Sequence, residues 1–181
     1  MFVFIMFSYG QEEKYPKRKL SIEPTIGLRV SSAFGLVDIQ VAGLVQYQIN
    51  NRFSFASHTA FSFDINSFKA FRNIDVKYSV TTFQKFGIGT SIYSKHCSHT
   101  LFIMGGGKYF SYSAKIVNPA LEDNVKTKFN TFSFDKGLMY NLKIGRRDTY
   151  FSSRIYAPLF DGKWVFIENA SLELGAGFKI K

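Results

Sequence analysis

The sequence predicts an all-β fold, a closed, antiparallel, up-and-down β-barrel of about eight transmembrane strands. Three observations favour this class. Apolar and polar residues alternate with a period of two over most of the chain from Leu20 onward. Turn-forming residues interrupt this alternation at intervals along the chain. Aromatic residues make up 18% of the 181 residues, yet no stretch after residue 11 approaches the run of about 18 apolar residues in a transmembrane helix.

The first residues are expected to be a targeting sequence rather than a part of the barrel. Residues 1–10 begin with the apolar run MFVFIMF and end with small residues before Gln11, as a signal-peptide cleavage site does. The basic segment that usually precedes such a run is missing, so a start further upstream and a buried strand are both left open. Residues 11–19 are then a polar leader, and residues 20–181 form a single barrel domain.

Each strand is expected where the alternation is regular. In the first, Leu20, Ile22 and Leu28 share one face, and polar residues between them occupy the other. Asn50-Asn51 separates the second strand from the third, because asparagine tolerates the positive φ of a tight hairpin turn. The expected strands are residues 20–30, 37–49, 53–65, 76–93, 100–112, 129–144, 150–160 and 171–180.

The connections alternate between short and long, and this alternation indicates the topology. The short ones are residues 50–51, 95–99 and 145–148, and the long, polar ones are residues 66–75 and 114–127. Tight turns on one rim and long loops on the other are typical of outer-membrane barrels. An even number of strands also lets the first and last strands pair, which leaves no open edge.

The polar face of the strands is expected to line the interior of the barrel. It is rich in Gly, Ser, Ala and Thr, which suits a narrow lumen, and it also carries charges of both signs. Buried charges are costly unless they pair, so these residues are expected to form a polar network that plugs the lumen. The members of this lumen polar network are Glu23, Arg29, Asp38, His58, Lys77, Lys85, Asp135, Lys143, Arg154 and Glu173.

The apolar face is expected to meet lipid. It carries more large side chains than the interior of a small barrel accommodates. Several strands also exceed the roughly ten residues that cross a bilayer at a tilt. Aromatic residues near the strand ends are candidates for interfacial girdles. They are Tyr47, Phe53, Tyr78, Phe86, Tyr140 and Phe151.

The pattern resembles the small outer-membrane β-barrel or porin-like families of Bacteroidetes-type bacteria. The resemblance is carried by the signal-like start ending in Tyr9-Gly10-Gln11, the repeated strand–turn–strand units, and the closing strand LELGAGF at residues 172–178. It covers nearly the whole chain and implies an exported protein with the outer-membrane bilayer and the barrel-insertion machinery as partners. Such families commonly end on an aromatic residue, whereas here Phe178 lies three places before the end.

Charge and cysteine content argue against several other classes. The net charge is +10, but Lys and Arg are spread along the chain apart from one cluster at Lys14 to Lys19. No zinc-finger spacing or basic helix accompanies them, so nucleic acid is not an expected partner. Cys97 is the single cysteine, which excludes a disulfide within the chain. His96 and His99 flank it without a fourth ligand at a recognisable spacing, so neither a metal nor another cofactor is expected.

Four functions remain open from the sequence. The first is a non-enzymatic barrel that stabilises the envelope or presents loops outside the cell to an unknown ligand. The second is a small porin or solute-binding barrel whose basic lumen attracts anions. The third is a lipid-modifying enzyme around His58, with Ser54, Ser62 and Asp64 on the same face, although residues two apart on a strand lie about 7 Å from each other. The fourth is a soluble, lipocalin-like carrier with its apolar face turned inward.

Overall fold

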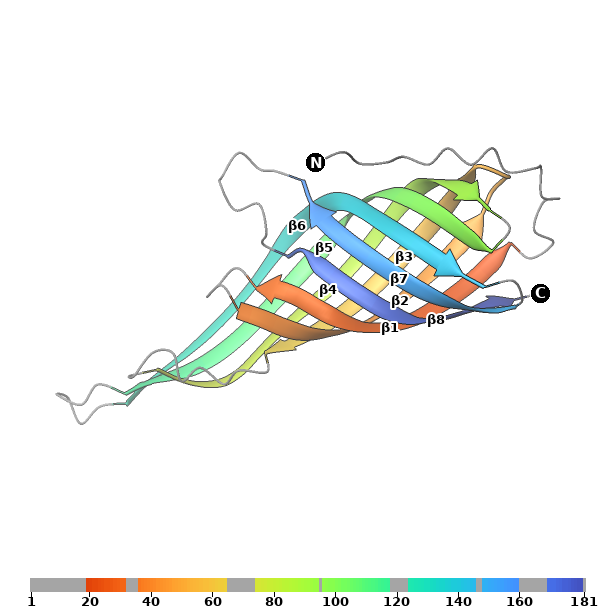
Figure 1. The fold of residues 1–181 in the computed structure, drawn as a ribbon. Helices are drawn as coiled ribbons and strands as arrows, with labels where there is room; N and C mark the ends of the chain where they lie inside the picture. Colours follow the sequence, from red (N-terminus) through yellow and green to blue (C-terminus); the bar gives the residue numbers. More distant parts are fainter. Residues whose placement is uncertain are drawn as a thin grey trace, which may run out of the picture.

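The chain forms a closed barrel in the computed structural model, which describes residues 19–31, 36–64, 74–94, 96–117, 124–145, 148–159 and 169–180. Eight antiparallel strands follow one another around this barrel, and the last pairs with the first (Figure 1). The predicted fold class and strand count are confirmed. No helix in the described ranges is long and apolar enough to cross a bilayer. The strands are β1 (Leu20–Ser31), β2 (Leu36–Gln48), β3 (Phe53–Asp64), β4 (Ile74–Tyr93), β5 (Cys97–Val117), β6 (Asn124–Ile144), β7 (Thr149–Pro158) and β8 (Ser171–Ile180).

Burial alternates along the strands with the period that the sequence predicts. In β7, Ser152, Arg154 and Tyr156 are buried, whereas Phe151 and Ile155 on the other face are exposed. Successive side chains of a strand point to opposite faces of the sheet, so closing the sheet puts one set inside and the other outside. The charged set lies inside and the aliphatic and aromatic set lies outside.

One rim of the barrel carries the tight turns. Between β2 and β3, the Oδ1 atom of Asn50 accepts hydrogen bonds from the backbone N–H groups of Arg52 (2.9 Å) and Phe53 (2.8 Å). This is the side-chain contact by which asparagine stabilises a turn. The turn between β4 and β5 is shorter than predicted, because Cys97 already belongs to β5 and its carbonyl accepts the Ser94 N–H at 2.8 Å.

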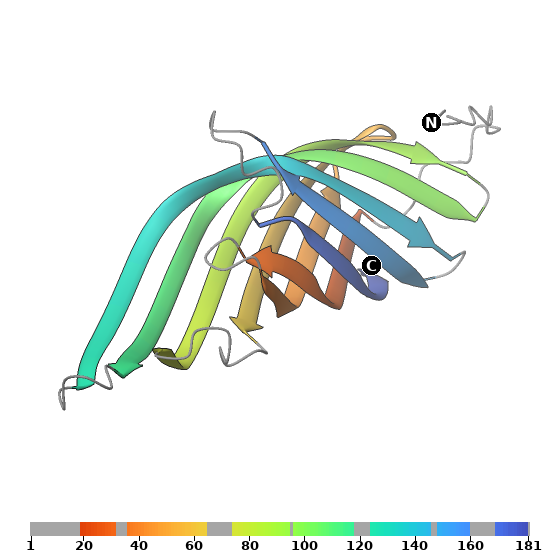
Figure 2. The same cartoon turned by 60° about the vertical axis from the view of Figure 1, so that its left-hand side comes forward.

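Three neighbouring strands extend far beyond the opposite rim. β4, β5 and β6 have 20, 21 and 21 residues, whereas the other strands have 10 to 13. Figures 1 and 2 show them running on together past the ends of the remaining strands. The pairing of β5 with β6 is continuous from Cys97↔Ile144 to Val117↔Asn124. We call residues 74–79, 110–117 and 124–131 the β4–β6 extension.

The β4–β6 extension occupies residues that the sequence assigns to loops. The predicted loop at 114–127 is replaced by strand up to Val117 and again from Asn124, and β4 begins at Ile74, within the predicted loop at 66–75. These residues include the β-branched Ile74, Ile116, Val117 and Val125, which favour strands, and pairing between neighbouring strands orders them. Residues 118–123 lie outside the described residues, as do residues 1–18 with the predicted signal peptide and most of the leader.

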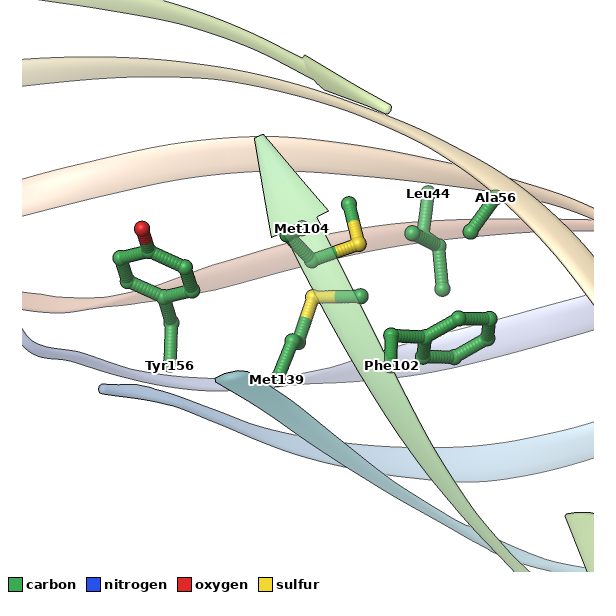
Figure 3. Close-up of a cluster of buried hydrophobic side chains, with 6 residues drawn as sticks. All are labelled: Leu44, Ala56, Phe102, Met104, Met139 and Tyr156. Atoms are coloured by element: carbon green, nitrogen blue, oxygen red, sulfur yellow. The ribbon is translucent and has the colours of Figure 1, made fainter. Parts of the chain in front are cut away.

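The interior holds large apolar side chains as well as the expected small and charged ones. Glycines of β4 provide the room for them. A Cβ atom added at Gly89 would lie 2.4 Å from the Phe102 ring, and one added at Gly87 would lie 2.3 Å from Met104 Sδ. The lumen is therefore packed by small residues on one strand facing large ones on the next. The main apolar cluster, drawn in Figure 3, comprises Leu44, Ala56, Phe102, Met104, Met139 and Tyr156.

Candidate functional site

The centre of the lumen is a network of ionisable side chains around Arg154. Its Nη1 atom lies 2.6 Å from Glu173 Oε2, and its Nη2 atom lies 3.2 Å from Glu23 Oε2. Lys143 Nζ lies 2.5 Å from the other oxygen of Glu23, and His58 Nε2 lies 3.1 Å from Glu173 Oε1. Arg154 and both glutamates are fully buried. The planar guanidinium thus joins two carboxylates from β1 and β8, the strands that close the barrel.

Neutral side chains complete the coordination of the two carboxylates. Thr25 Oγ1 and Gln40 Nε2 donate to Glu173 at 2.8 and 2.6 Å. Tyr150 OH and Asn141 Nδ2 donate to Glu23 at 2.8 and 2.9 Å. A buried ion pair repays its desolvation only when further hydrogen bonds satisfy its remaining lone pairs, and these four donors do so.

Two further ion pairs lie apart from this network. Lys85 Nζ is 2.6 Å from Asp135 Oδ2, and the ammonium also stands 3.3 Å from the centre of the Tyr156 ring. Arg29 pairs with Asp38 on the neighbouring strand, and its guanidinium donates to Thr81 Oγ1 and Asn169 Oδ1 at 2.9 Å each. The ionisable side chains of the lumen therefore divide into three groups that draw on seven strands.

Nine of the ten residues predicted for the lumen polar network lie buried or half-buried among these three groups. The tenth, Lys77, is the extra residue where the β4–β5 register shifts between Val76 and Tyr78, and its side chain is outside those described. The neutral residues Thr25, Gln40 and Asn141 were not among the ten predicted members of the network. The signal for them was available, because Thr25, Gln40 and Asn141 alternate in phase with the charged residues of their own strands.

The surroundings of His58 do not form a hydrolase-like site. Its Nε2 atom is engaged by Glu173. Ser62 Oγ donates to Gln40, and Ser54 Oγ accepts from Gln46 Nε2 at 3.0 Å. Among the described residues no hydrogen bond joins His58 to a serine, whereas nucleophilic catalysis requires nucleophile and base within hydrogen-bond reach.

The Cys97 region does not gather a metal-ligand set within the described ranges. Cys97 Sγ lies 3.4 Å from His99 Nε2, and the other ring nitrogen of His99 lies 2.6 Å from Tyr140 OH. No group of three or more His, Cys, Asp or Glu side chains in the described residues is arranged to hold a metal ion. These contacts of His99 with Cys97 and Tyr140 join β5 to β6 near the rim that carries the tight turns.

The outer wall of the barrel carries exposed apolar side chains on every strand, with an outward polar group of Ser57, Thr59 and Gln84 and the exposed Lys136 among them. Ile26, Ile88 and Ile103 are each at least 60% exposed, and Phe132 and Phe134 are 74% and 69% exposed. Burial of apolar area is worth roughly 25 cal/mol per Å², so a wall of this kind is costly in water and suited to hydrocarbon. A lipocalin-like carrier places its apolar face inside, and this barrel has the opposite arrangement.

The two faces exchange their polarity within β5 and β6. The register pairs Tyr109 with Phe132 on the outer face, and the next outward pairs towards the tip are Ser111↔Asn130 and Ser113↔Lys128. These outward positions therefore change from aromatic to polar within one step of two residues, and Ser111 Oγ donates to Asn130 Oδ1 at 2.8 Å.

At the same position along the strands, the inner face changes from polar to aromatic. Lys108 faces inward and donates to Asn169 at 3.3 Å, whereas the next inward residues of β5 are Phe110 and Tyr112, whose rings stack with centroids 6.3 Å apart. Phe129 of β6 lies across from Tyr112 and 6.4 Å from the Phe110 ring. Beyond Tyr109, β5 and β6 of the extension thus have a polar outer face and an aromatic inner face, whereas β4 keeps the exposed Tyr78 opposite the outward Ser113.

Comparison with known proteins places the fold. No protein-family model matches the chain, and no curated protein sequence matches it either. Among solved structures, Ail, the attachment invasion locus protein of Yersinia pestis, is similar with a TM-score of 0.56 and 13% identity, over 90% of this chain and 97% of Ail. Neisserial surface protein A is similar with a TM-score of 0.54 and 13% identity, over 93% of this chain and all of that one.

A third similar structure is the N-terminal β-barrel domain of Pseudomonas aeruginosa OprF. Its TM-score is 0.51 at 9% identity, over 92% of this chain and all of that domain. At such identities the likeness concerns the fold alone. This chain has the fold of the small eight-stranded barrels that these proteins represent.

Proposed function

We propose that this chain is a non-enzymatic protein of the bacterial outer membrane that holds the β4–β6 extension outside the cell as an interaction surface. The reversal of polarity at Tyr109 and Phe110 carries the proposal. An outward apolar face suits lipid, and an outward polar face suits water, so the change of sign marks where the wall leaves the hydrocarbon. We further propose that residues 1–10 act as a signal peptide for export. The chain is also proposed to be related to the small outer-membrane barrels of Bacteroidetes-type bacteria.

The arrangement of the rims supports the orientation. Leu20 of β1 and Ile180 of β8 pair at the rim that carries the tight turns, and the β4–β6 extension lies at the other end. In outer-membrane barrels the short turns face the periplasm and the longer loops face the exterior. The outer-membrane bilayer and the barrel-insertion machinery are accordingly the partners we propose for the wall.

The packed lumen supports a plug rather than a channel. The network around Arg154 and the apolar cluster around Phe102 and Met139 fill the interior between them. Eight strands leave an interior that side chains just fill. The small-porin alternative requires a free path, and the interior packing argues against one.

Cysteine labelling tests the proposal. In a Cys97→Ser background, single cysteines replace Asn130 in the extension, Ile103 in the wall and Asn51 at the turn rim. The probe is a maleimide on a polyethylene glycol chain of about 5 kDa, which is too large for ordinary porins. On intact cells we expect labelling at 130 only, and labelling at 51 after the outer membrane is permeabilised. Position 103 should react only after boiling in SDS.

Two results would contradict the proposal. Labelling at 51 and protection at 130 on intact cells would reverse the orientation. Recovery of the chain as a soluble periplasmic protein, with no change of SDS-gel mobility between unboiled and boiled samples, would remove the membrane altogether.

A further inference from the structure

We propose that the outer edge of β6 within the β4–β6 extension, residues 124–131, binds an extended acidic peptide that adds to the sheet as a further strand. The inference rests on the proposed function, because the partner must reach the extension from outside the cell. The strand addition also defines the chemistry of that partner, which the orientation of the barrel in the membrane does not.

The pairing of the strands leaves this edge open among the described residues. β6 pairs with β7 only from Gly137↔Pro158 to Ile144↔Phe151, whereas its pairing with β5 runs on to Asn124. On the side away from β5, no described strand pairs with residues 124–136. At about 3.4 Å per residue, the part of this edge that lies in the extension, residues 124–131, is roughly 27 Å long.

The backbone groups that face the open side are identified by one hydrogen bond. The Lys136 carbonyl accepts the Leu159 N–H at 2.8 Å, so the N–H and C=O of Lys136 point away from β5. Alternate residues of a strand point the same way, so those of Lys128 and Asn130 face the open side as well. A row of unpaired N–H and C=O groups is a template for another strand.

The opposite edge of the extension is a poorer template. β4 passes beyond its last β3 partner at Val80 and continues only to Ile74. The register shift at Lys77 interrupts this short stretch. Bulges protect edge strands from further pairing, whereas β6 is regular along its whole pairing with β5.

The side chains on each side of the β6 edge determine the chemistry of the partner. The exposed Lys128 stands on the outer face, and residues 124–131 contain two lysines and no acidic residue. On the inner face Phe129 is 52% exposed beside the Phe110 ring. Because strand residues alternate, a partner that fits both faces carries acidic side chains on one and apolar side chains on the other.

Fluorescence anisotropy with the folded barrel in nanodiscs tests this inference. The probe is a labelled peptide of about twelve residues in which Glu and Val alternate. Asn130→Pro removes one N–H from the open side and leaves the β5 ladder intact, and Asn130→Ala is its matched control because it keeps that N–H. We expect Asn130→Pro to weaken binding at least tenfold, Asn130→Ala to change it less than threefold, and Lys128→Glu to weaken it about tenfold.

Two methylated versions of the peptide test the backbone contact directly. In an antiparallel addition, the residues opposite Lys128 and Asn130 have side chains on the same face as these two, so the Glu N–H groups point at β6. N-methylation of the Glu residues should abolish binding, and N-methylation of the Val residues should preserve it.

The outcomes separate this inference from the proposed function. Equal binding of both methylated peptides, or of Asn130→Pro and Asn130→Ala, would overturn the strand addition. Heparin binding that depends on Lys128, with no peptide binding, would assign the face to polyanions instead. Self-association of the barrel abolished by Asn130→Pro, again without peptide binding, would assign the edge to a second copy. Each of these results leaves the labelling at position 130 unchanged.

Discussion

In β5 and β6, the closed wall of the barrel and the β4–β6 extension have opposite arrangements of polarity. In the wall, Ile103 and Phe134 face outward and the Lys85–Asp135 pair lies inside. In the extension, Lys128 faces outward and the Phe110 and Tyr112 rings stack on the inner face. A strand carries two faces in either case, and the medium on each side determines which one is apolar.

The largest effect is expected at the centre of the lumen. Arg154→Ala should lower the free energy of unfolding by about 3 to 5 kcal/mol, because it leaves the Glu23 and Glu173 carboxylates without their shared cation. Urea unfolding in lipid vesicles, followed by the SDS-gel mobility shift, measures it. Lys128→Ala in the extension is the control and should stay within about 0.5 kcal/mol of the unmodified chain. Comparable losses for the two variants would mean that the lumen network has no special role in stability.

A similar contrast is expected between apolar side chains. Phe102 is fully buried in the lumen, and Phe129 in the extension is 52% exposed. Phe102→Ala should destabilise the barrel by about 3 to 5 kcal/mol through the cavity that it leaves, and Phe129→Ala by less than about 1 kcal/mol. The same unfolding measurement applies. If Phe129→Ala proved as costly as Phe102→Ala, the extension would have to be part of the cooperative core.

An arginine scan along the outward face of β5 should locate the boundary between the two regions. Arginine at Ile103 should cost about 2 to 4 kcal/mol, and arginine at Ser111 or Ser113 close to zero. The drop should fall after Tyr109, where the outward positions change from aromatic to polar. Unfolding of the same variants in micelles provides the control, since only the cost of arginine at lipid-facing positions should depend on whether a bilayer surrounds the barrel. A cost that stays constant along the strand would contradict the proposed boundary.

The smallest effect is expected when an ion pair is replaced as a unit. Lys85→Met and Asp135→Leu should each cost about 3 kcal/mol alone, because each leaves an uncompensated buried charge. The double variant should lie within about 1 kcal/mol of the unmodified chain, since the apolar pair fills the same space beside Phe83 and Tyr156. A double-mutant cycle by urea unfolding measures the coupling. Additive losses would show that the two side chains act independently.

Much of the fold follows from local patterns. Period-two alternation, together with turn residues such as Asn50, was enough to predict eight strands and a closed barrel. Alternation also placed Glu23, Arg154 and Glu173 on one face, because the direction of a side chain on a strand depends only on its position. The inward direction of Thr25 and Gln40 was predicted in the same way from their phase, and that of Asn141 follows from the phase of Lys143.

Other features depend on contacts that no local pattern contains. Residues 114–117 and 124–127 lie in a segment predicted to be a loop, and they become strands because β5 and β6 pair with each other over the full length of the extension. The partners within the lumen, such as Arg154 with two glutamates from β1 and β8, depend on the register of strands far apart in the chain. The sequence by itself determined the strands and their faces, since these depend on neighbours one or two residues away. Only the tertiary structure decided which charges meet, how far three strands extend and which edge of β6 stays open, because these depend on how the strands pair when the barrel closes.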